Sequence, residues 1–290
     1  MAISSEGTAI QYENDLPGPL SDTDALLIER RRIAESNSDF ISFVIPAYNE
    51  GGKIYKNLLE CLRVVRRYGV PFELVVVNDG SSDNTIHEII RAAAHSPEIV
   101  PVSYSKNVGK GNALKVGARR ASGNLVVFMD ADLEIHPKHA MKFMYMLKAT
   151  EADVVIGSKR HPDSKVDYPT KRKFLSWGYH LLIKAMFNLD VTDTQPGFKL
   201  FRKDVLDKEI NKVEAQRYAF DLDLLVNVQA DGYKIVEAPI ELNFSRSCGG
   251  RIGFKTVKSI FKETMGVFYR ARMAKSTDNT NVAATSGPQD

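Results

Sequence analysis

The pattern of hydrophobic and polar positions changes at residue 40. Residues 1–38 are polar and show no sustained period apart from a short helical stretch over 24–34, so they are predicted to form a flexible N-terminal arm. Beyond this point, short runs of β-branched and aromatic residues alternate with longer segments of helical periodicity. This alternation is typical of βαβ units and predicts an α/β fold around a mostly parallel central sheet.

The apolar runs are continuous rather than alternating, which predicts strands covered by helices on both faces. The predicted strands are residues 40–46, 72–78, 99–105, 124–130, 153–157 and 234–242. The predicted helices are residues 51–68, 83–95, 110–121, 137–149, 174–189, 218–230 and 254–272. Residues 39–245 are therefore expected to form the α/β domain, 246–274 a basic amphipathic segment, and 275–290 a disordered tail.

Composition and charge narrow the class of protein. With 43% hydrophobic and 26% charged residues the chain is typical of soluble globular proteins, and a net charge of +3 is too small to indicate a nucleic-acid partner. No apolar run reaches the roughly 18 residues of a membrane-spanning helix, and the N-terminus has no signal-peptide pattern. Two cysteines without metal-ligand spacing predict reduced thiols in a cytoplasmic protein.

Polar residues follow three of the predicted strands. Open α/β sheets bind ligands beyond the carboxyl ends of their strands, so these residues are candidates for a binding site. They are Pro46, Tyr48 and Glu50 after the first strand, Asp79 after the second, and Asp130 and Asp132 after the fourth. Each group alone could be a turn, a helix cap or a surface charge, but three on one rim favour a ligand site.

Asp130 and Asp132 suggest a divalent cation. Residues two apart on a strand point to one side, and two close carboxylates repel each other unless a cation lies between them. Oxygen ligands favour Mg²⁺ or Mn²⁺, which would bridge a substrate diphosphate. A glycine-bracketed Lys110 opens the helix before this strand, predicted at 110–121, where backbone N–H groups favour an anion, so Lys110 is a candidate ligand-binding residue. The chain lacks a GxxxxGK[ST] loop and a GxGxxG after a strand, which argues against P-loop NTPases and dinucleotide-binding dehydrogenases.

Longer motifs carry a resemblance to a known family. Residues 40–245 resemble a GT-A-fold glycosyltransferase of family two through VIPAYNE, VVNDGSSDNT, NVGKGNALKVGARRASG and the DAD at 130–132. The later motifs GSKR (157–160), DTQPGFKLF (193–201) and RYAFDLDLL (217–225) resemble the polyprenyl- or dolichyl-phosphate hexose synthases, which make phosphate-linked mannose or glucose. The resemblance implies an inverting hexosyltransferase that uses a nucleotide sugar and Mg²⁺ or Mn²⁺.

The resemblance also implies roles for individual residues. Pro46, Tyr48 and Glu50 would line the nucleoside site, with Asp79 on the base. Asp132 would be a metal ligand, with Asp130 nearer the ribose or the metal-bound diphosphate. Glu134 stands where a glutamine is common and would be a third ligand. Lys159, Arg160 and Arg172 would face donor or acceptor phosphate, and Asp193 and Gln195 would contact sugar hydroxyls or shape the acceptor site.

The acceptor decides whether the reaction needs a general base. A lipid monophosphate is already mostly dianionic at neutral pH, because its second pKa is about 6, and so needs none. An alcohol acceptor on a glycan or protein would need one, and Asp193 is then the candidate. UDP-glucose and GDP-mannose both remain open as donors. A non-catalytic binding module is a further alternative, which the intact DAD motif disfavours.

A polyprenyl acceptor would bring the protein to a membrane surface, on the cytosolic face. The apolar segment 174–189 contains Trp177 and Tyr179, which favour the bilayer interface. The segment 254–272 places apolar residues at helical spacing among lysines and arginines, the composition of an interfacial helix on anionic lipid. Both segments could instead pack on the core or a second subunit, and a membrane-protein partner is possible.

Overall fold

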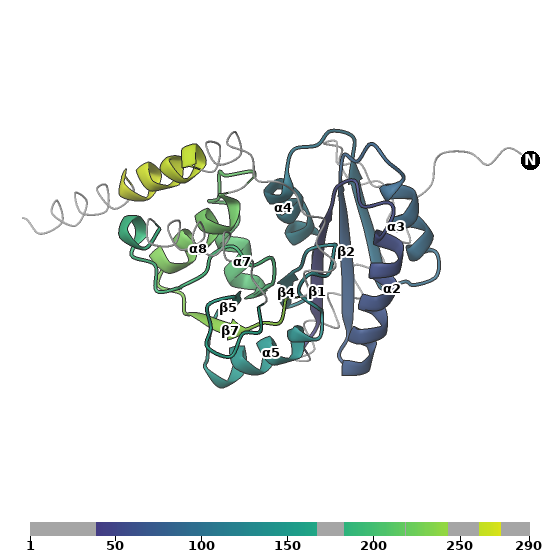
Figure 1. Ribbon diagram of the computed structural model, residues 1–290, viewed down its shortest axis with the longest axis horizontal. Helices are drawn as coiled ribbons and strands as arrows, with labels where there is room; N and C mark the ends of the chain where they lie inside the picture. Colours follow the sequence, from purple (N-terminus) through teal and green to yellow (C-terminus); the bar gives the residue numbers. More distant parts are fainter. Residues whose placement is uncertain (1–38, 167–182, 218, 243–260, 274–290) are drawn as a thin grey trace, which may run out of the picture.

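The computed structural model describes residues 39–166, 183–217, 219–242 and 261–273 (Figure 1). The arm over 1–38, the tail over 275–290, Arg172, and parts of both predicted membrane segments lie outside these residues. The described residues build one seven-stranded sheet in the order β3-β2-β1-β4-β6-β5-β7, with helices on both faces.

The elements follow the predicted order. The strands are β1 (Ile41–Ala47), β2 (Phe72–Asp79), β3 (Ile99–Tyr104), β4 (Leu125–Phe128), β5 (Val154–Ser158), β6 (Lys199–Arg202) and β7 (Ile235–Pro239). The helices are α2 (Ile54–Val65), η1 (Arg66–Tyr68), α3 (Thr85–Ala93), α4 (Lys110–Arg120), α5 (His139–Ala149), α7 (Lys203–Glu209) and α8 (Phe220–Ala230). Residues 183–187 and 261–273 are also helical.

The sheet is mostly parallel, as predicted. β1 pairs in parallel with β2 and β4, β2 with β3, and β5 with β7, whereas β6 runs antiparallel to both of its neighbours. The sequence pattern did not predict β6 or α7. β6 is only four residues long and begins with Lys199. This lysine is fully buried, but a lysine in the sequence does not indicate a buried central strand.

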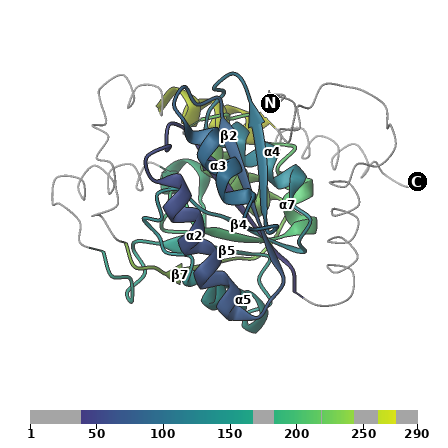
Figure 2. The ribbon, with the colours of Figure 1, turned by 90° about the vertical axis from the view of Figure 1, so that its right-hand side faces the viewer.

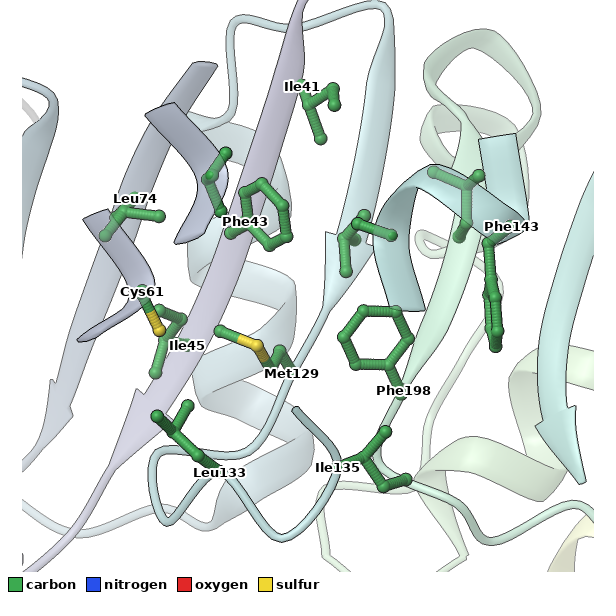
Figure 3. Packing of buried hydrophobic residues seen from close by; sticks show 14 of the residues in the cluster. Ile41, Phe43, Ile45, Cys61, Leu74, Met129, Leu133, Ile135, Phe143 and Phe198 are labelled. Carbon is green, nitrogen blue, oxygen red and sulfur yellow. The ribbon is translucent and has the colours of Figure 1, made fainter. Parts of the chain in front are cut away.

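Two hydrophobic clusters cover the two faces of the sheet. Helices α2, α3 and α5 pack on one face, and α4, α7 and α8 pack on the other (Figure 1, Figure 2). Strand β1 serves both clusters, because Phe43 points to the first and Val44 to the second. Figure 3 shows the first cluster, in which Phe143 and Phe198 meet edge to face with ring centroids 5.1 Å apart. The continuous apolar runs of the sequence are thus explained by burial on both faces.

The helix over residues 261–273 has two different faces. Thr264 and Val267 are buried, and Val267 belongs to the second core cluster. Phe261, Tyr269 and Met273 are 52%, 61% and 71% exposed, and they are spaced for one side of the helix. Among the described residues, no helix combines the length and apolar character needed to cross a bilayer.

Buried His139 at the start of α5 should make stability depend on pH. Its ring packs near Phe143 and Phe198, and its Nε2 accepts a hydrogen bond from the Glu241 backbone N–H at 3.3 Å. Burial, aided by Lys138, lowers the pKa of His139 from 6.5 to about 4. Between these values the unfolded chain binds a proton that the folded chain does not, so the free energy of unfolding falls as the pH drops through this window.

The expected loss approaches about 3 kcal/mol once the pH is below both values and is absent above pH 7. Urea unfolding at a series of pH values would measure it, with His139→Asn as the matched variant. The variant should show a shallower fall in stability between pH 6.5 and 4. An identical pH dependence in both proteins would contradict the assignment to His139.

Candidate active site

A cleft of about 540 Å³ opens beyond the carboxyl ends of β1, β2 and β4. It gathers most of the residues that the sequence singled out, namely Pro46, Tyr48, Glu50, Asp79, Lys110, Asp130, Asp132, Lys159 and Gln195. It also contains residues that the sequence did not single out, namely Asn107, Gly109, Arg217 and Asp221. Glu134, Arg160 and Asp193 are described but do not line the cleft.

Asp79, at the end of β2, uses its carboxylate to hold the neighbouring loop. The side chain is almost fully buried and accepts hydrogen bonds from Tyr104 Oη at 2.7 Å and Asn107 Nδ2 at 2.8 Å. It also accepts the backbone N–H groups of Val108 and Gly109, both at 2.9 Å. The two backbone N–H groups just before α4 therefore bind the chain's own carboxylate.

Gly109 is required at its position beside the cleft. Its φ is +120°, a conformation that favours glycine, and an added Cβ would lie 2.8 Å from Arg217 Cγ. The loop before α4 thus approaches the Arg217 side chain closely, which places this guanidinium-bearing residue against the same cleft as Lys110.

The two aspartates after β4 come together through a turn. The predicted strand 124–130 is too long, because β4 ends at Phe128 and Asp130 and Asp132 lie beyond it. Leu133 adopts a positive φ of 55°, and Asp132 Oδ1 accepts the backbone N–H of Glu134 at 3.0 Å. Strand alternation therefore does not orient the two carboxylates, and the turn holds Asp132 through a backbone hydrogen bond.

The two carboxylates differ in how their charge is compensated. Asp130 forms an ion pair with Lys110. Burial by itself raises the pKa of Asp130, but Lys110, followed by Lys199 and Lys159, outweighs burial and lowers it. Burial lowers the pKa of Lys110, but the charges of Asp130 and Asp221 raise it more. Lys110 and Asp130 therefore both stay charged. The negative charge of Asp130 is therefore balanced by Lys110 within the protein.

Asp132 and Glu50 carry the less compensated charge. Burial, followed by the nearby Asp130, raises the pKa of Asp132. Burial, followed by Asp132, raises the pKa of Glu50. Like charges in a partly buried cleft disfavour ionisation unless a cation joins them. Asp132 and Glu50 are thus the carboxylates of the cleft whose charge a bound cation would compensate.

The donor set fits a hard divalent cation that also uses substrate oxygens. Within residues 39–166, 183–217, 219–242 and 261–273, no three histidine, cysteine or carboxylate side chains gather closely enough to hold a metal alone. Asp132 and Asp130 would supply oxygen ligands only, which suits Mg²⁺ or Mn²⁺ completed by diphosphate and water. Glu134 is not among the residues that line the cleft, and its assignment as a third ligand remains a prediction.

Asp193 lies beside the cleft and organises its rim. One carboxylate oxygen accepts the Lys159 backbone N–H at 3.1 Å, and the other accepts the Gln195 N–H at 3.2 Å. Its own N–H donates to Glu237 on β7 at 3.1 Å. Asp193 therefore ties together the two segments that present Lys159 and Gln195 to the cleft.

A buried ion pair supports the floor of the cleft. Lys199 on β6 is fully buried, and its Nζ donates to Asp221 Oδ1 at 2.8 Å and to the Pro196 carbonyl at 2.5 Å. Asp221 lines the cleft from the first turn of α8. The signal for Arg217 and Asp221 was the motif RYAFDLDLL, in which Arg217 precedes an apolar helix and Asp221 lies in its first turn, but the motif alone did not assign them to the site.

Comparison with known proteins gives a family and a fold. Residues 42–209 match the family model described as glycosyl transferase family 2. Dolichyl-phosphate beta-glucosyltransferase ALG5D of Trichomonas vaginalis is 33% identical over 242 residues, covering 80% of this chain and 74% of the relative. ALG5C of the same organism, also a dolichyl-phosphate beta-glucosyltransferase, is 30% identical over 243 residues, covering 80% and 72%.

A solved structure shares the fold. Glucosyl-3-phosphoglycerate synthase from Mycobacterium tuberculosis, in complex with Mn²⁺, UDP-glucose and phosphoglyceric acid, superposes with a TM-score of 0.61. The two proteins are 18% identical, and the match covers 84% of this chain and 83% of the other. The GT-A fold predicted from the sequence is therefore confirmed.

Proposed function

Because the chain belongs to glycosyl transferase family 2, we propose that it is an inverting glucosyltransferase acting on a polyprenyl or dolichyl phosphate. The donor is a nucleotide-glucose, and the reaction takes place at the cytosolic face of a membrane. The names of the similar Trichomonas vaginalis enzymes favour glucose over mannose and a dolichyl phosphate over other acceptors. UDP-glucose is the donor that we expect.

The observation that carries the proposal is the distribution of charge in the cleft. Glu50, Asp130 and Asp132 share one cleft with Lys110, Lys159 and Arg217. Carboxylates alone would suit a cation, and cations alone would suit a phosphate. Both together suit a nucleoside diphosphate that carries a divalent ion, which is the leaving group of a nucleotide-sugar transfer.

Asp132, with Asp130 beside it, would hold Mg²⁺ or Mn²⁺, and the bound ion supplies charge neutralisation for the leaving diphosphate. The protein's own groups then perform the remaining work. Lys110 keeps Asp130 ionised, and Asp79 holds the loop that carries Lys110 and Gly109. Lys159 and Arg217 supply positive charge that reduces repulsion between donor diphosphate and acceptor phosphate.

The position of Asp193 favours a phosphate acceptor over a hydroxyl acceptor. Deprotonating an alcohol needs a base that faces the reaction centre. Asp193 does not line the cleft, and each of its carboxylate oxygens accepts a backbone N–H group that holds it at the rim. A dianionic phosphate needs no base, so the arrangement of Asp193 is compatible with this acceptor and unfavourable for the alcohol.

Label transfer tests the proposal directly. The purified protein is incubated with Mn²⁺, dolichyl phosphate and either UDP-[¹⁴C]glucose or GDP-[¹⁴C]mannose, and the products are extracted into organic solvent. We expect label in the organic phase from UDP-glucose only, and none when dolichol replaces dolichyl phosphate. Transfer to dolichol or to a soluble glycan, without transfer to the phosphate, would contradict the acceptor assignment.

The outer face of the helix over 261–273 supports a place at the membrane surface. Phe261, Tyr269 and Met273 form an exposed apolar stripe beside Lys262, on a helix whose other face is packed on the core. An apolar stripe flanked by positive charge suits an anionic lipid surface. The segment 174–189 is described only from residue 183 onward, and its interfacial role stays a prediction.

A further inference from the structure

The helix over residues 261–273 contacts the segment that brings Arg217 to the cleft. We propose that Arg270 and Glu263 on this helix are positioning residues, which hold Arg217 in place for the donor diphosphate. The inference rests on the proposed function, because the position of Arg217 matters only if the cleft binds a nucleoside diphosphate.

Arg270 fixes the start of the segment through Asp223. Its Nη2 donates to Asp223 Oδ2 at 2.8 Å, and the Asp223 side chain is only 4% exposed. The same oxygen accepts the backbone N–H groups of Glu214 and Ala215, both at 3.0 Å. Arg270 Nη1 also lies 3.4 Å from Glu214 Oε2. The guanidinium therefore compensates the buried carboxylate that holds residues 214 and 215.

Glu263 fixes the other end of the segment. Its Oε2 accepts the backbone N–H of Ala219 at 3.1 Å, immediately before α8 begins at Phe220. Glu263 and Arg270 are seven residues apart, two helical turns, and so project from one side of the helix. One helix thus holds both ends of the segment that contains Arg217.

The segment lies close to the wall of the cleft. The Gln216 carbonyl accepts the Asn112 backbone N–H at 3.3 Å, and a Cβ on Gly111 would lie 2.7 Å from that carbonyl oxygen. The adjacent Arg217 packs over Gly109 with the close approach described above. Small displacements of the segment would therefore move the Arg217 guanidinium relative to Lys110 and Asp130.

Polar contacts, more than packing, connect the helix to this segment. A cavity of about 350 Å³ lies between them, lined by Gln216, Arg217, Glu263, Gly266 and Arg270 among others. Thr264 and Val267 are buried, so the helix itself is anchored independently of the two contacts. Removing one contact should thus loosen one end of the segment without detaching the helix.

A double-mutant cycle on nucleotide binding tests the inference. UDP binding in the presence of Mn²⁺ is measured by calorimetry for the wild type, Arg217→Ala, Arg270→Leu and the double variant. We expect Arg270→Leu to weaken UDP binding roughly five- to tenfold, and to have no further effect when Arg217 is already alanine. Arg272→Leu removes the same charge from the same helix, where Arg272 lies near the Phe268 ring, and should leave UDP binding unchanged.

Two variants of Glu263 give a second test, in case Arg270→Leu, which removes the partner of Asp223, prevents folding. Glu263→Gln keeps an oxygen that can accept the Ala219 N–H and should bind UDP like the wild type. Glu263→Leu removes that oxygen and should weaken binding. Equal effects of Gln and Leu, or equal effects of Arg270→Leu with and without Arg217, would overturn the positioning role. Failure of the wild type to bind either UDP or GDP would instead overturn the proposed function and, with it, this inference.

Discussion

Replacing Asp132 with asparagine is expected to lower glucosyl transfer by roughly a hundredfold or more while the fold stays intact. The amide keeps the volume of the side chain but removes the charge that would hold the divalent cation. Asp130 is already paired with Lys110, whereas burial and the nearby Asp130 disfavour the charge of Asp132 unless a cation compensates it. Initial rates with UDP-[¹⁴C]glucose and dolichyl phosphate, together with thermal unfolding, would measure both effects.

Two controls make this prediction specific. Asp163→Asn applies the same chemical change to a side chain that is 80% exposed and outside the cleft, and it should retain the wild-type rate. Excess EDTA should abolish wild-type turnover, and added Mn²⁺ or Mg²⁺ should restore it. An Asp132→Asn rate above about a tenth of the wild type, a barrier change under ~1.4 kcal/mol, would remove the metal role from Asp132.

The strands were predictable because their signal is local. Both faces of β1 are buried, so its sequence is apolar at successive positions, as with Phe43 and Val44 in opposite clusters. β6 carries no such signal. Lys199 is buried there because Asp221, 22 residues later, supplies its counter-charge, and nothing in the neighbouring sequence reveals that partner.

The candidate site shows the same division between local and distant causes. The polar ends of the strands identified Asp79, Asp130 and Asp132 as members of one cleft. The sequence did not reveal what the Asp79 carboxylate binds, because its partners lie 25 to 30 residues further along the chain.

Arg217 was missed for a related reason. Its place in the cleft depends on Gly109 before it and on contacts of Glu263 and Arg270 after it. Sequence patterns identify elements and the rim of a sheet, whereas long-range polar contacts decide which charged side chain faces the ligand.

The outer face of the helix over 261–273 is expected to hold the protein on anionic membranes. Replacing Phe261, Tyr269 and Met273 together with serine should lower partition onto phosphatidylserine vesicles by roughly a hundredfold. Each side chain is at least half exposed, so burying its remaining apolar surface in lipid contributes about 1 kcal/mol, or about 3 kcal/mol for the three. The inner face, with Thr264 and Val267, is unchanged, so thermal stability and UDP binding should stay at wild-type values.

Tyr145→Ser provides the matched control for this membrane prediction, because Tyr145 on α5 is 73% exposed and lies on another element. It should partition like the wild type in vesicle sedimentation. Raising the salt concentration should weaken wild-type binding only in part, since screening acts on Lys262 and other charges but not on the apolar stripe. If the triple variant sediments with vesicles as the wild type does, the helix does not contact lipid, and the segment 174–189 becomes the remaining candidate. If salt alone releases the wild type completely, the attraction is electrostatic and the apolar stripe has no part in it.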